Sequence, residues 1–528
     1  MRSVMTHQFS QVPKAEIQRS SFDRSHGYKT TFDAGGLYPI FVDEVLPGDT
    51  FNLKMTGFAR LATPIYPIMD NMVMETFFFF VPNRLLWVNW KKFNGEQQNP
   101  GDSTDFTVPQ AVCTNGWEIG SLGDYFGLPT GVAGLTCNAL PLRAYRLIYN
   151  EWFRDQNLQN ASSVPTTDGP DNYPNGFNVL KRGKRHDYFT SCLPWPQKGE
   201  SVNLPLGERA LVMMDSSPVL TGTQNPLVWS RTDGNIIQNA NIETGANGVT
   251  TAHTGSAGAF ITNVYPNNLY ADLTDATAAT INQLRQAFQI QRLLERDARG
   301  GTRYTEIIKS HFGVTSPDAR LQRPEYLGGG SSPVTFSPIA QTQATSAGVT
   351  PQGNLAAMAT ANLQGHGFTQ SFTEHGYIIG LVNVRADLTY QQGLDRMWSR
   401  ATRYDFYWPA LAHIGEQAVL SKEIYCDGTA GDEDVFGYQE RYAELRYKPS
   451  RITGLFRSSA AQSLDAWHLS QEFATRPILD ATFITENPPV DRIIAVPDEP
   501  HFLFDSYFRL RCARPMPLYG VPGLIDHF

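Results

Sequence analysis

The sequence predicts a mainly β protein, an antiparallel sandwich that carries long helical and loop insertions. Strand-like segments lie near both ends of the chain, in residues 37–81 and 501–515, and helical patterns lie between them. The run Phe77–Phe80 places four phenylalanines in a row, and a strand buries such a run only when both of its faces have apolar cover. The 528 residues, 41% of them hydrophobic, are ample for a large core.

The strands are predicted from alternation and turn residues. In residues 37–81 apolar and polar residues alternate in part, and a turn is expected at Pro47-Gly48-Asp49. Strands are expected again beyond Gly376, followed by a segment rich in Trp and Tyr. Residues 501–515 predict a strand that bends near Asp505. Its apolar side chains, expected to be buried, are Phe502, Phe504, Tyr507, Phe508 and Leu510.

Three helices are predicted between the strands. Residues 83–95 start after a proline and end at Asn-Gly, and residues 140–158 carry a broad apolar stripe. The longest helix is expected in residues 277–301, with Thr277 or Asp275 as its cap and two glycines at its end. Its last turn is cationic, which we interpret as a solvated edge with a favourable dipole contact and not as a DNA-reading surface.

Most of the chain is expected to lie in insertions, because a minimal eight-stranded jelly roll uses only roughly 90 residues. These insertions, or neighbouring subunits, are expected to supply the second apolar cover of Phe77–Phe80. Residues 328–367, rich in Gly, Ser, Gln and Thr, predict an extended arm or long loop. Three regions follow: residues 1–215, with an N-terminal arm and the first part of the core; residues 216–268, poor in charge, a surface insertion; and residues 269–528, with a helical insertion, extended loops, the remaining strands and a C-terminal arm.

No catalytic residue, metal site or cofactor is predicted, so the protein is not expected to be an enzyme. Phosphate-loop, zinc-protease, nucleophile-elbow and EF-hand patterns are missing from the sequence. His366 and His375 lack a nearby third ligand, and the acidic turn that contains Asp427 and Asp432 is expected to be solvated. A β-sandwich glycosidase would need two carboxylates facing each other across a cleft, a pairing that a sequence does not reveal.

The chain is expected to stay in a reducing cytoplasm without membrane insertion. The five cysteines are scattered, odd in number and form no Cys-x-x-Cys pair, which predicts neither a disulfide framework nor a zinc site. No apolar run approaches the roughly 20 residues of a spanning helix. The first 21 residues lack the apolar core of a secretory signal.

One basic cluster is a candidate for contact with nucleic acid. It combines four cations with a Tyr and a Phe close behind, a mixture that suits a phosphate chain with unstacked bases. The cations are Lys181, Arg182, Lys184 and Arg185. A subunit contact and an exposed loop remain open as alternatives. The net charge of −8 means that the surface as a whole is not that of a basic nucleic-acid-binding domain.

Long segments carry a resemblance to a known family. They include VDEVLPGDTFNLKMTGFARLATPIYPIMDN (residues 42–71), FFFFVPNRLLW (77–87), LLERDARGGTRYTEIIKSHFGVTSPDARLQRPEYLGG (293–329) and RPMPLYGVPGLIDHF (514–528). These segments resemble the major capsid proteins of gokushoviruses, small single-stranded DNA phages of the Microviridae. The likeness covers nearly the whole chain except residues 216–268 and short loops.

The resemblance implies a virion component: a jelly-roll subunit that assembles in the host cytoplasm, in about sixty copies, into a T=1-like icosahedral shell around circular single-stranded DNA. Residues 216–268 would then be the family's variable insertion, similar to a protrusion at the threefold axes and a candidate for attachment to a host surface receptor. Because each subunit carries a net charge of −8, a small basic DNA-packaging protein is an expected partner. Scaffolding or pilot proteins are further candidate partners.

The C-terminal tail is expected to order against a neighbouring copy or its own subunit. It has no helical or strand period, and its apolar side chains lie among prolines. These side chains are Tyr519, Val521, Leu524, Ile525 and Phe528. One alternative function is a jelly-roll carbohydrate-binding protein that never assembles, but the length of the chain and of the matching segments favours the capsid.

Overall fold

The computed structural model describes residues 17–174, 176–200, 202, 281–348 and 350–520, together with seven short strands between 211 and 272. The chain separates into two compact units, of which the second is Gln197–Asp297 and the first is the rest. Apart from short strands, the surface insertion expected at residues 216–268 lies outside the described residues. The second unit contains most of α5 (Ile281–Arg299) and the strands β9 (Leu211–Met214), β10 (Trp229–Arg231), β11 (Ile236–Ile237), β12 (Ala240–Thr244), β13 (Thr250–Thr254), β14 (Val264–Pro266) and β15 (Leu269–Asp272).

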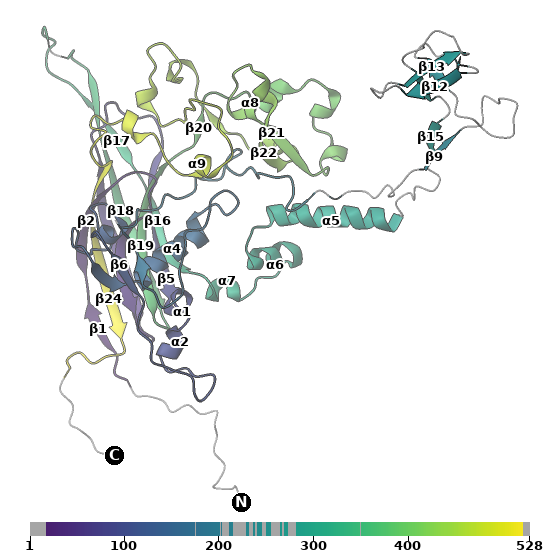
Figure 1. Cartoon of the computed structure of the whole chain (residues 1–528). Helices are drawn as coiled ribbons and strands as arrows, with labels where there is room; N and C mark the ends of the chain where they lie inside the picture. The colour runs from purple at the N-terminus through teal and green to yellow at the C-terminus, as the bar shows by residue number, and fades with distance from the viewer. Residues whose placement is uncertain are drawn as a thin grey trace, which may run out of the picture. The chain divides into compact units, whose positions relative to one another are not determined.

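The first unit is built on one curled antiparallel sheet of ten strands, which stands upright in Figure 1. Its strands are β1 (Ser20–Asp23), β2 (His26–Phe32), β3 (Tyr38–Val45), β4 (Thr50–Leu61), β5 (Met72–Pro82), β16 (Glu325–Pro333), β17 (Thr335–Ala340), β18 (Leu355–Ser371), β19 (Gly376–Ala386) and β24 (Phe502–Arg514). The path through the sheet is β1-β24-β4-β18-β16-β5-β19-β3, with β2 also on β24 and β17 on β18.

The pairing of these strands is that of a jelly roll. β1 and β2 pair with successive parts of β24 and act as one strand, while β17 forms a hairpin with β18. Eight strands are left when these are counted in this way. Numbered along the chain, the first pairs with the eighth, the second with the seventh, the third with the sixth and the fourth with the fifth. This nesting defines two facing sheets, β2-β24-β4-β18 and β16-β5-β19-β3. The predicted antiparallel jelly-roll sandwich is confirmed.

The apolar cover on both faces that Phe77–Phe80 require is present. Phe78 and Phe80 point between the two sheets into the main core, with Phe41, Leu53 and Phe508. Phe79, 1% exposed, points the other way into a second core, against which Phe77 packs. That second core is formed by insertion residues, so the protein's own chain and not a neighbouring subunit covers the outer face of this sheet.

The helices of the first unit belong mainly to the connection after β5. The helix predicted at residues 83–95 is two short helices, because the chain is extended at Trp87. The helix predicted at residues 140–158 runs from α4 (Leu140–Ile148) into a π-helical turn, Tyr149–Phe153, and ends there. The elements on this side are α1 (Asn83–Leu86), α2 (Trp90–Phe93), β6 (Gln110–Cys113), α3 (Leu122–Tyr125), β7 (Leu135–Asn138), α4 (Leu140–Ile148), β8 (Asp171–Asn172), α6 (Tyr304–Phe312) and α7 (Asp318–Leu321).

The caps predicted for the longest helix, Thr277 and Asp275, lie outside the described residues. α5 ends at Arg299, before the predicted Gly300-Gly301 stop. Among the described helices, none has both the length and the hydropathy that crossing a membrane would require.

Residues 328–367, expected to form an extended arm or long loop, are mostly strand. This segment supplies most of β16, all of β17 and most of β18, and two of its glycines, Gly329 and Gly367, pair where the two sheets meet. Gly329 pairs with Gly367; a Cβ added to Gly329 would lie 2.0 Å from the carbonyl oxygen of Thr76, and one added to Gly367 would lie 2.1 Å from that of Leu53. The glycines therefore permit a close approach of backbones, and their abundance does not indicate a loop.

The last strand differs from its prediction at one side chain and in its shape. β24 keeps an unbroken register with β4 from Phe502 to Ala513, so no bend occurs near Asp505. Burial alternates along the strand, which turns Tyr507 outward, 52% exposed, between inward-facing Ser506 and Phe508. Strict alternation decides the face, although Tyr507 is apolar enough for the interior.

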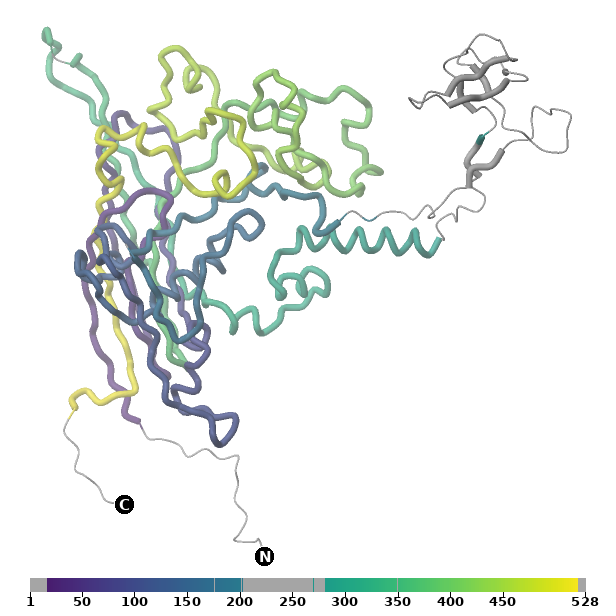
Figure 2. The backbone as a smooth tube through the Cα atoms, viewed as in Figure 1, coloured from purple at the N-terminus to yellow at the C-terminus, as the bar shows by residue number. Residues whose placement is uncertain are grey.

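A separate lobe, the C-terminal insertion, is formed by residues 387–501, which Figure 2 traces in green and yellow. It has its own core, which includes Tyr188, Phe189 and Phe436. Its elements are β20 (Thr389–Tyr390), β21 (Glu416–Leu420), α8 (Ser421–Ile424), β22 (Val435–Glu440), β23 (Ser450–Arg451), α9 (Ala481–Ile484) and 3-10 turns at Arg396–Ser399, Arg403–Asp405, Pro409–Leu411, Ala430–Glu433, Ala443–Leu445, Gly454–Phe456, Asp465–Trp467 and Val490–Arg492.

Candidate functional site

Of the four cations predicted to contact nucleic acid, two are exposed, one is half-buried and one is buried. The Lys181 Nζ donates to Asn487 Oδ1 at 2.6 Å, and the Arg185 side chain, 45% exposed, lies 3.4 Å from Asp387. Arg182 and Lys184 point into the subunit. Contact with nucleic acid by this cluster stays a prediction, and only Lys181 and Arg185 present their charges at the surface.

Arg182 is part of an ion-pair network centred on Glu75 of β5. Its guanidinium lies 2.8 Å from one Glu75 carboxylate oxygen, and Arg385 of β19 lies 2.6 Å from the other. The same guanidinium packs over the rings of Phe77 and Phe153, with 5.5 Å and 5.3 Å to the ring centroids. Burial lowers the pKa of Arg182, and the neighbouring Glu75 opposes that shift. The network therefore joins strands β5 and β19 of the sandwich to the segment that contains Arg182.

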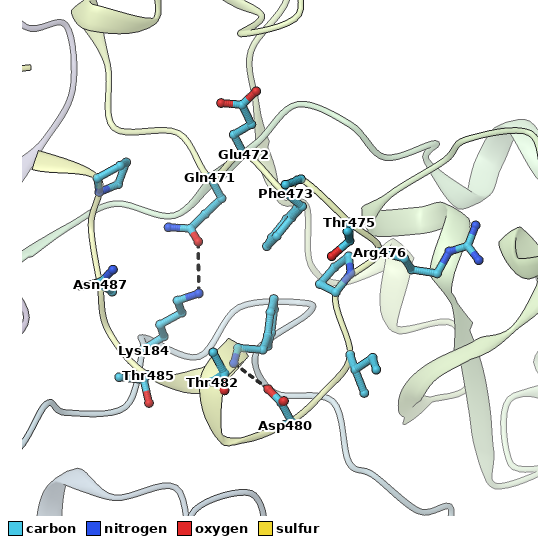
Figure 3. A pocket seen from close by; sticks show the side chains of 15 residues that line it. Lys184, Gln471, Glu472, Phe473, Thr475, Arg476, Asp480, Thr482, Thr485 and Asn487 are labelled. Atoms are coloured by element: carbon cyan, nitrogen blue, oxygen red, sulfur yellow. Dashed lines mark hydrogen bonds between the residues drawn. The ribbon is translucent and has the colours of Figure 1, made fainter. Parts of the chain in front are cut away.

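Lys184 extends this network into the C-terminal insertion. Its ammonium donates to Gln471 Oε1 at 3.1 Å and lies 4.6 Å from the ring centroid of Phe483. In Figure 3 Lys184 points toward Gln471. Both residues line a pocket of about 570 Å³. Glu486 is 1% exposed, and burial raises the pKa of its carboxyl to about 7, although Lys184 and Arg182 favour the charged form.

The C-terminal insertion presents an exposed aromatic segment, residues 397–414, which we call the aromatic surface. It is wound into three short 3-10 turns, which leave its large side chains outside the core. Its exposed apolar side chains are Met397 (49%), Trp398 (70%), Tyr404 (67%), Phe406 (52%), Tyr407 (52%), Trp408 (41%) and Ile414 (62%). Soluble monomers rarely expose so many large apolar side chains together, and such surfaces mark interaction sites.

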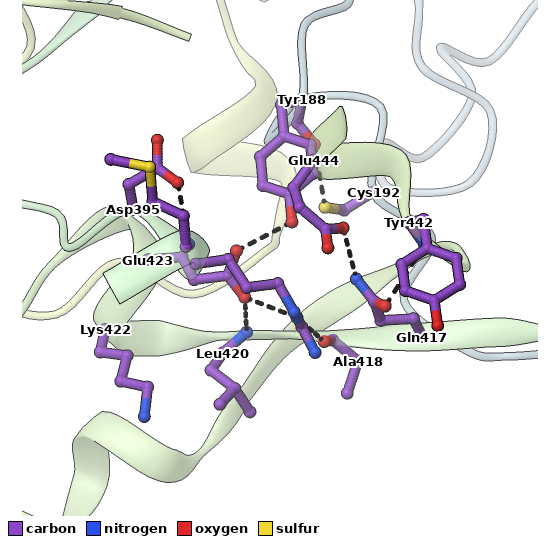
Figure 4. A network of polar contacts seen from close by, with 12 residues as sticks. Tyr188, Cys192, Asp395, Gln417, Ala418, Leu420, Lys422, Glu423, Tyr442 and Glu444 are labelled. Carbon is purple, nitrogen blue, oxygen red and sulfur yellow. Dashed lines mark hydrogen bonds and ion pairs between the residues drawn. The ribbon is translucent and has the colours of Figure 1, made fainter. Parts of the chain in front are cut away.

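A buried polar network anchors the aromatic surface (Figure 4). Arg396, at its start, donates to Glu423 Oε1 at 2.8 Å and to the carbonyl oxygen of Ala418 at 2.7 Å. The other oxygen of Glu423 accepts from the Tyr188 hydroxyl at 2.8 Å. Burial raises the pKa of Glu423, while Arg396 opposes that shift. At the other side, the Tyr442 hydroxyl donates to the carbonyl oxygen of Phe406 at 3.0 Å. The surface is therefore exposed but held in place.

The remaining candidates from the sequence have structural surroundings. His366 is buried and hydrogen-bonded to Thr76 and Ser332, at 2.7 Å and 3.1 Å, and burial lowers the pKa of its imidazole. The acidic turn is not simply solvated, because Arg476 pairs with Asp427 and Asp432 at 2.8 Å and 3.0 Å. Within the described parts of the chain, no three His, Cys, Asp or Glu residues are arranged to hold a metal ion.

The predicted tail contacts fall mostly beyond the described residues. Tyr519 is 80% exposed. The other four residues, Val521, Leu524, Ile525 and Phe528, lie outside the described part of the chain.

Comparison with known proteins decides the family. A family model described as capsid protein (F protein) matches residues 10–524. The chain belongs to this capsid family. Capsid protein VP1 of Bdellovibrio phage phiMH2K is 50% identical over 527 residues, which cover 99% of this chain and 98% of that protein.

Two further relatives of this capsid protein are also similar along nearly their whole length. Capsid protein VP1 of Chlamydia phage 1 is 47% identical, over 99% of this chain and 98% of the relative. Capsid protein VP1 of Spiroplasma virus 4 is 38% identical, over 98% and 97%. The resemblance to gokushovirus major capsid proteins is confirmed, and with it the chain's place among proteins of the virion.

Sequence reasoning noticed the residues of the capsid protein's aromatic surface but gave them no role. Composition showed a segment rich in Trp and Tyr, and such segments are more often buried than exposed. The signal that was available is the absence of strand or helix periodicity in residues 397–414. Aromatic residues that do not recur with the spacing of a helix or strand do not gather on one face of an element, so no such face can pack against the core.

Proposed function

We propose that this capsid protein self-assembles, in about sixty copies, into a T=1-like icosahedral shell that encloses a circular single-stranded DNA genome. The observation that carries the proposal is the aromatic surface. An isolated subunit leaves its large side chains in water, and burying them against another copy supplies free energy for assembly. Aromatic residues and arginine are the residue types enriched at protein interfaces.

The arginines of the aromatic surface support this role. Arg403 lies over the Trp408 ring, 4.7 Å from its centroid, and Arg400 lies over Phe406 at 5.7 Å. Arg400 pairs with Glu444 at 3.2 Å and is 13% exposed, whereas the exposed Arg403 widens the apolar contact area and still offers donors to carbonyl oxygens of a partner. A closed shell repeats every such contact in each copy, so even a modest gain per interface holds the particle together.

The other partners follow from charge and length. At a net charge of −8 per subunit, the shell does not neutralise the genome, so a small basic DNA-packaging protein joins it. Residues 216–268 form the threefold protrusion and attach to the host receptor, and scaffolding or pilot proteins assist assembly in the host cytoplasm. The role is structural and not enzymatic, in keeping with relatives that are capsid proteins.

Electron microscopy with light scattering on the purified full-length chain tests the proposal. Uniform closed particles of megadalton mass are expected, alone or after co-expression with the other viral structural proteins. A protein that stays monomeric in both settings would contradict assembly and favour the carbohydrate-binding alternative. The ratio of absorbance at 260 and 280 nm before and after nuclease treatment then tests whether the particles protect nucleic acid.

A further inference from the structure

The two outer faces of the sandwich differ in their cover. Insertion residues close the outer face of β16-β5-β19-β3, where the second apolar core lies. Along the outer face of β2-β24-β4-β18 alternate side chains are exposed, and among them Leu503, Tyr507 and Phe58 are 56%, 52% and 48% exposed. In Figure 1 the labelled helices α1, α2, α4, α6 and α7 lie to one side of the upright sheet, with β2 and β24 at its other side. We call this uncovered face the open face.

The open face carries cations that repel one another. Arg509 of β24 pairs directly with Lys54 of β4, and both side chains are exposed. Arg511 lies two residues further along β24, opposite Asn52, and Arg60 lies opposite Leu503. Within the described residues, no carboxylate lies within ion-pair distance of Lys54, Arg60, Arg509 or Arg511. Like charges directly across a strand pair destabilise a sheet, so this arrangement costs folding free energy.

The open face has fewer carboxylates than cations. Asp505 pairs with Lys29 of β2 at 3.3 Å. Asp23, which stands opposite Arg511, accepts from the hydroxyl and the backbone nitrogen of Ser25, at 2.6 Å and 3.0 Å; these hydrogen bonds, and to a smaller extent the charges of Arg511 and Arg509, lower its pKa. The excess of positive charge on this face is therefore left for something outside the subunit, although the chain as a whole is acidic.

Exposed rings lie among these cations. Tyr507 is on the same face as Arg509, two residues away along β24, and stands opposite Thr56. Phe58 stands opposite Asp505 on the neighbouring strand. A flat surface that combines phosphate-binding cations with exposed rings matches a nucleic acid whose bases are unpaired, because bases of any sequence stack on aromatic side chains. An acidic peptide would need the cations alone.

We propose that the open face binds single-stranded nucleic acid, with Lys54, Arg509 and Arg511 on phosphates and Tyr507 and Phe58 under bases. The inference rests on the proposed function, because it identifies the face of the subunit that lies against the enclosed genome. Bound phosphates also relieve the repulsion between Arg509 and Lys54, which accounts for the presence of a pair that weakens the free subunit.

The test measures binding of a fluorescein-labelled, single-stranded thirty-nucleotide oligo-dT to unassembled full-length subunits across a salt series. The charge variant is Lys54→Gln/Arg509→Gln, and the matched control is Lys91→Gln/Lys309→Gln, which removes two exposed charges from α2 and α6. We expect the charge variant to bind at least about tenfold more weakly and to lose roughly 1.4 from the slope of log affinity against log salt. Tyr507→Ala is expected to weaken binding about tenfold with an unchanged slope.

The outcomes separate this inference from the proposed function. An unchanged affinity and slope in the charge variant would overturn the inference, as would equal affinity for duplex of the same length, or a preference for polyglutamate or anionic vesicles. Thermal unfolding serves as the folding check, and removal of the like-charge pair is expected to leave the midpoint equal or higher. The charge variant keeps the aromatic surface, on which particle formation depends. A wild-type chain that forms no particles would therefore contradict the proposed function alone.

Discussion

Glu75 and Arg182 meet 2.8 Å apart at the surface of the second apolar core, one from strand β5 and the other from the connection that crosses it. Glu75 also binds Arg385 at 2.6 Å, and Arg185 lies 4.0 Å away, so one carboxylate serves three guanidinium groups. The side chains of Glu75 and Arg385 are each 11% exposed, and that of Arg182 is 14% exposed. Much of the positive charge of the cluster around residue 182 is therefore used to hold the subunit together.

Glu75→Gln should destabilise the folded subunit severely. Removing one partner of a buried pair leaves uncompensated charge, here that of the largely buried Arg182 and Arg385, and costs about 3–5 kcal/mol. Chemical unfolding followed by tryptophan fluorescence would measure the change. The exposed pair of Lys29 and Asp505, with side chains 79% and 56% exposed, is the control, and Lys29→Ala should cost less than about 1 kcal/mol. Similar losses in both variants would show that the Glu75 network is not a structural centre.

Glu486 should make the stability of the subunit depend on pH near neutrality. Its pKa is about 7 in the folded protein, against 4.5 for an ordinary glutamate. Between these values the folded state binds more protons than the unfolded state, so stability falls as the pH rises from about 4.5 to about 7. Glu486→Gln removes this part of the fall.

Urea midpoints measured between about pH 5 and about pH 8 would check that expectation. The variant should lose less stability across the range than the wild-type chain. Glu499→Gln, which changes an exposed carboxylate, should keep the wild-type dependence. Parallel curves for the wild-type chain and Glu486→Gln would refute the assignment.

Phe78 and Phe79 should prove equally costly to truncate, although they point to opposite faces of one strand. Each is at most 1% exposed, and Phe→Ala at such positions costs about 3–5 kcal/mol. Phe58→Ala, on the open face, should change the free energy of unfolding by less than about 1 kcal/mol. A mild effect of Phe79→Ala, read from the same denaturation curves, would mean that the insertion is not part of the cooperative core.

Trp398→Ser/Tyr404→Ser should abolish closed particles and leave a folded subunit. Both side chains are mostly exposed, at 70% and 67%, so their loss removes interface area without opening a cavity. Light scattering would report assembly, and circular dichroism the fold. Leu321→Ser, 52% exposed on α7, is a control outside the aromatic surface and should still assemble. Normal particles from the double variant would exclude this surface from the contacts of the shell.

Deletion of residues 519–528 should block shell closure and leave the subunit folded. The tail has apolar side chains among prolines but no period of its own, so it gains order only against another surface. Electron microscopy of the truncated chain is the measurement. Particles of normal size would refute the role assigned to the tail.

Local sequence patterns predicted the elements whose surroundings are specified by the residues of the element itself. The phenylalanine run required two-sided cover, and the turn at Pro47-Gly48-Asp49 required its glycine, whose φ is 92° between β3 and β4. The helix of residues 140–158 was visible as an apolar stripe, although the π-helical turn that ends it was not. Long motifs identified the family, because matches over tens of residues do not arise by chance.

The tertiary structure decided everything that depends on residues far apart in the chain. Composition made residues 328–367 look like a loop, whereas their glycines are needed because Gly367 lies against β4, some three hundred residues earlier. From the sequence, Lys184 is expected to be a surface cation, whereas in the structure it lies beside Gln471 and Glu486. The pairing of Arg509 with Lys54 exists only in the register of β24 on β4. The sequence by itself determined the fold class, the two-sided burial of the phenylalanine run and the family. Which charges are neutralised, and which are left exposed, was decided by strand register and by burial, which bring together groups that no local pattern connects.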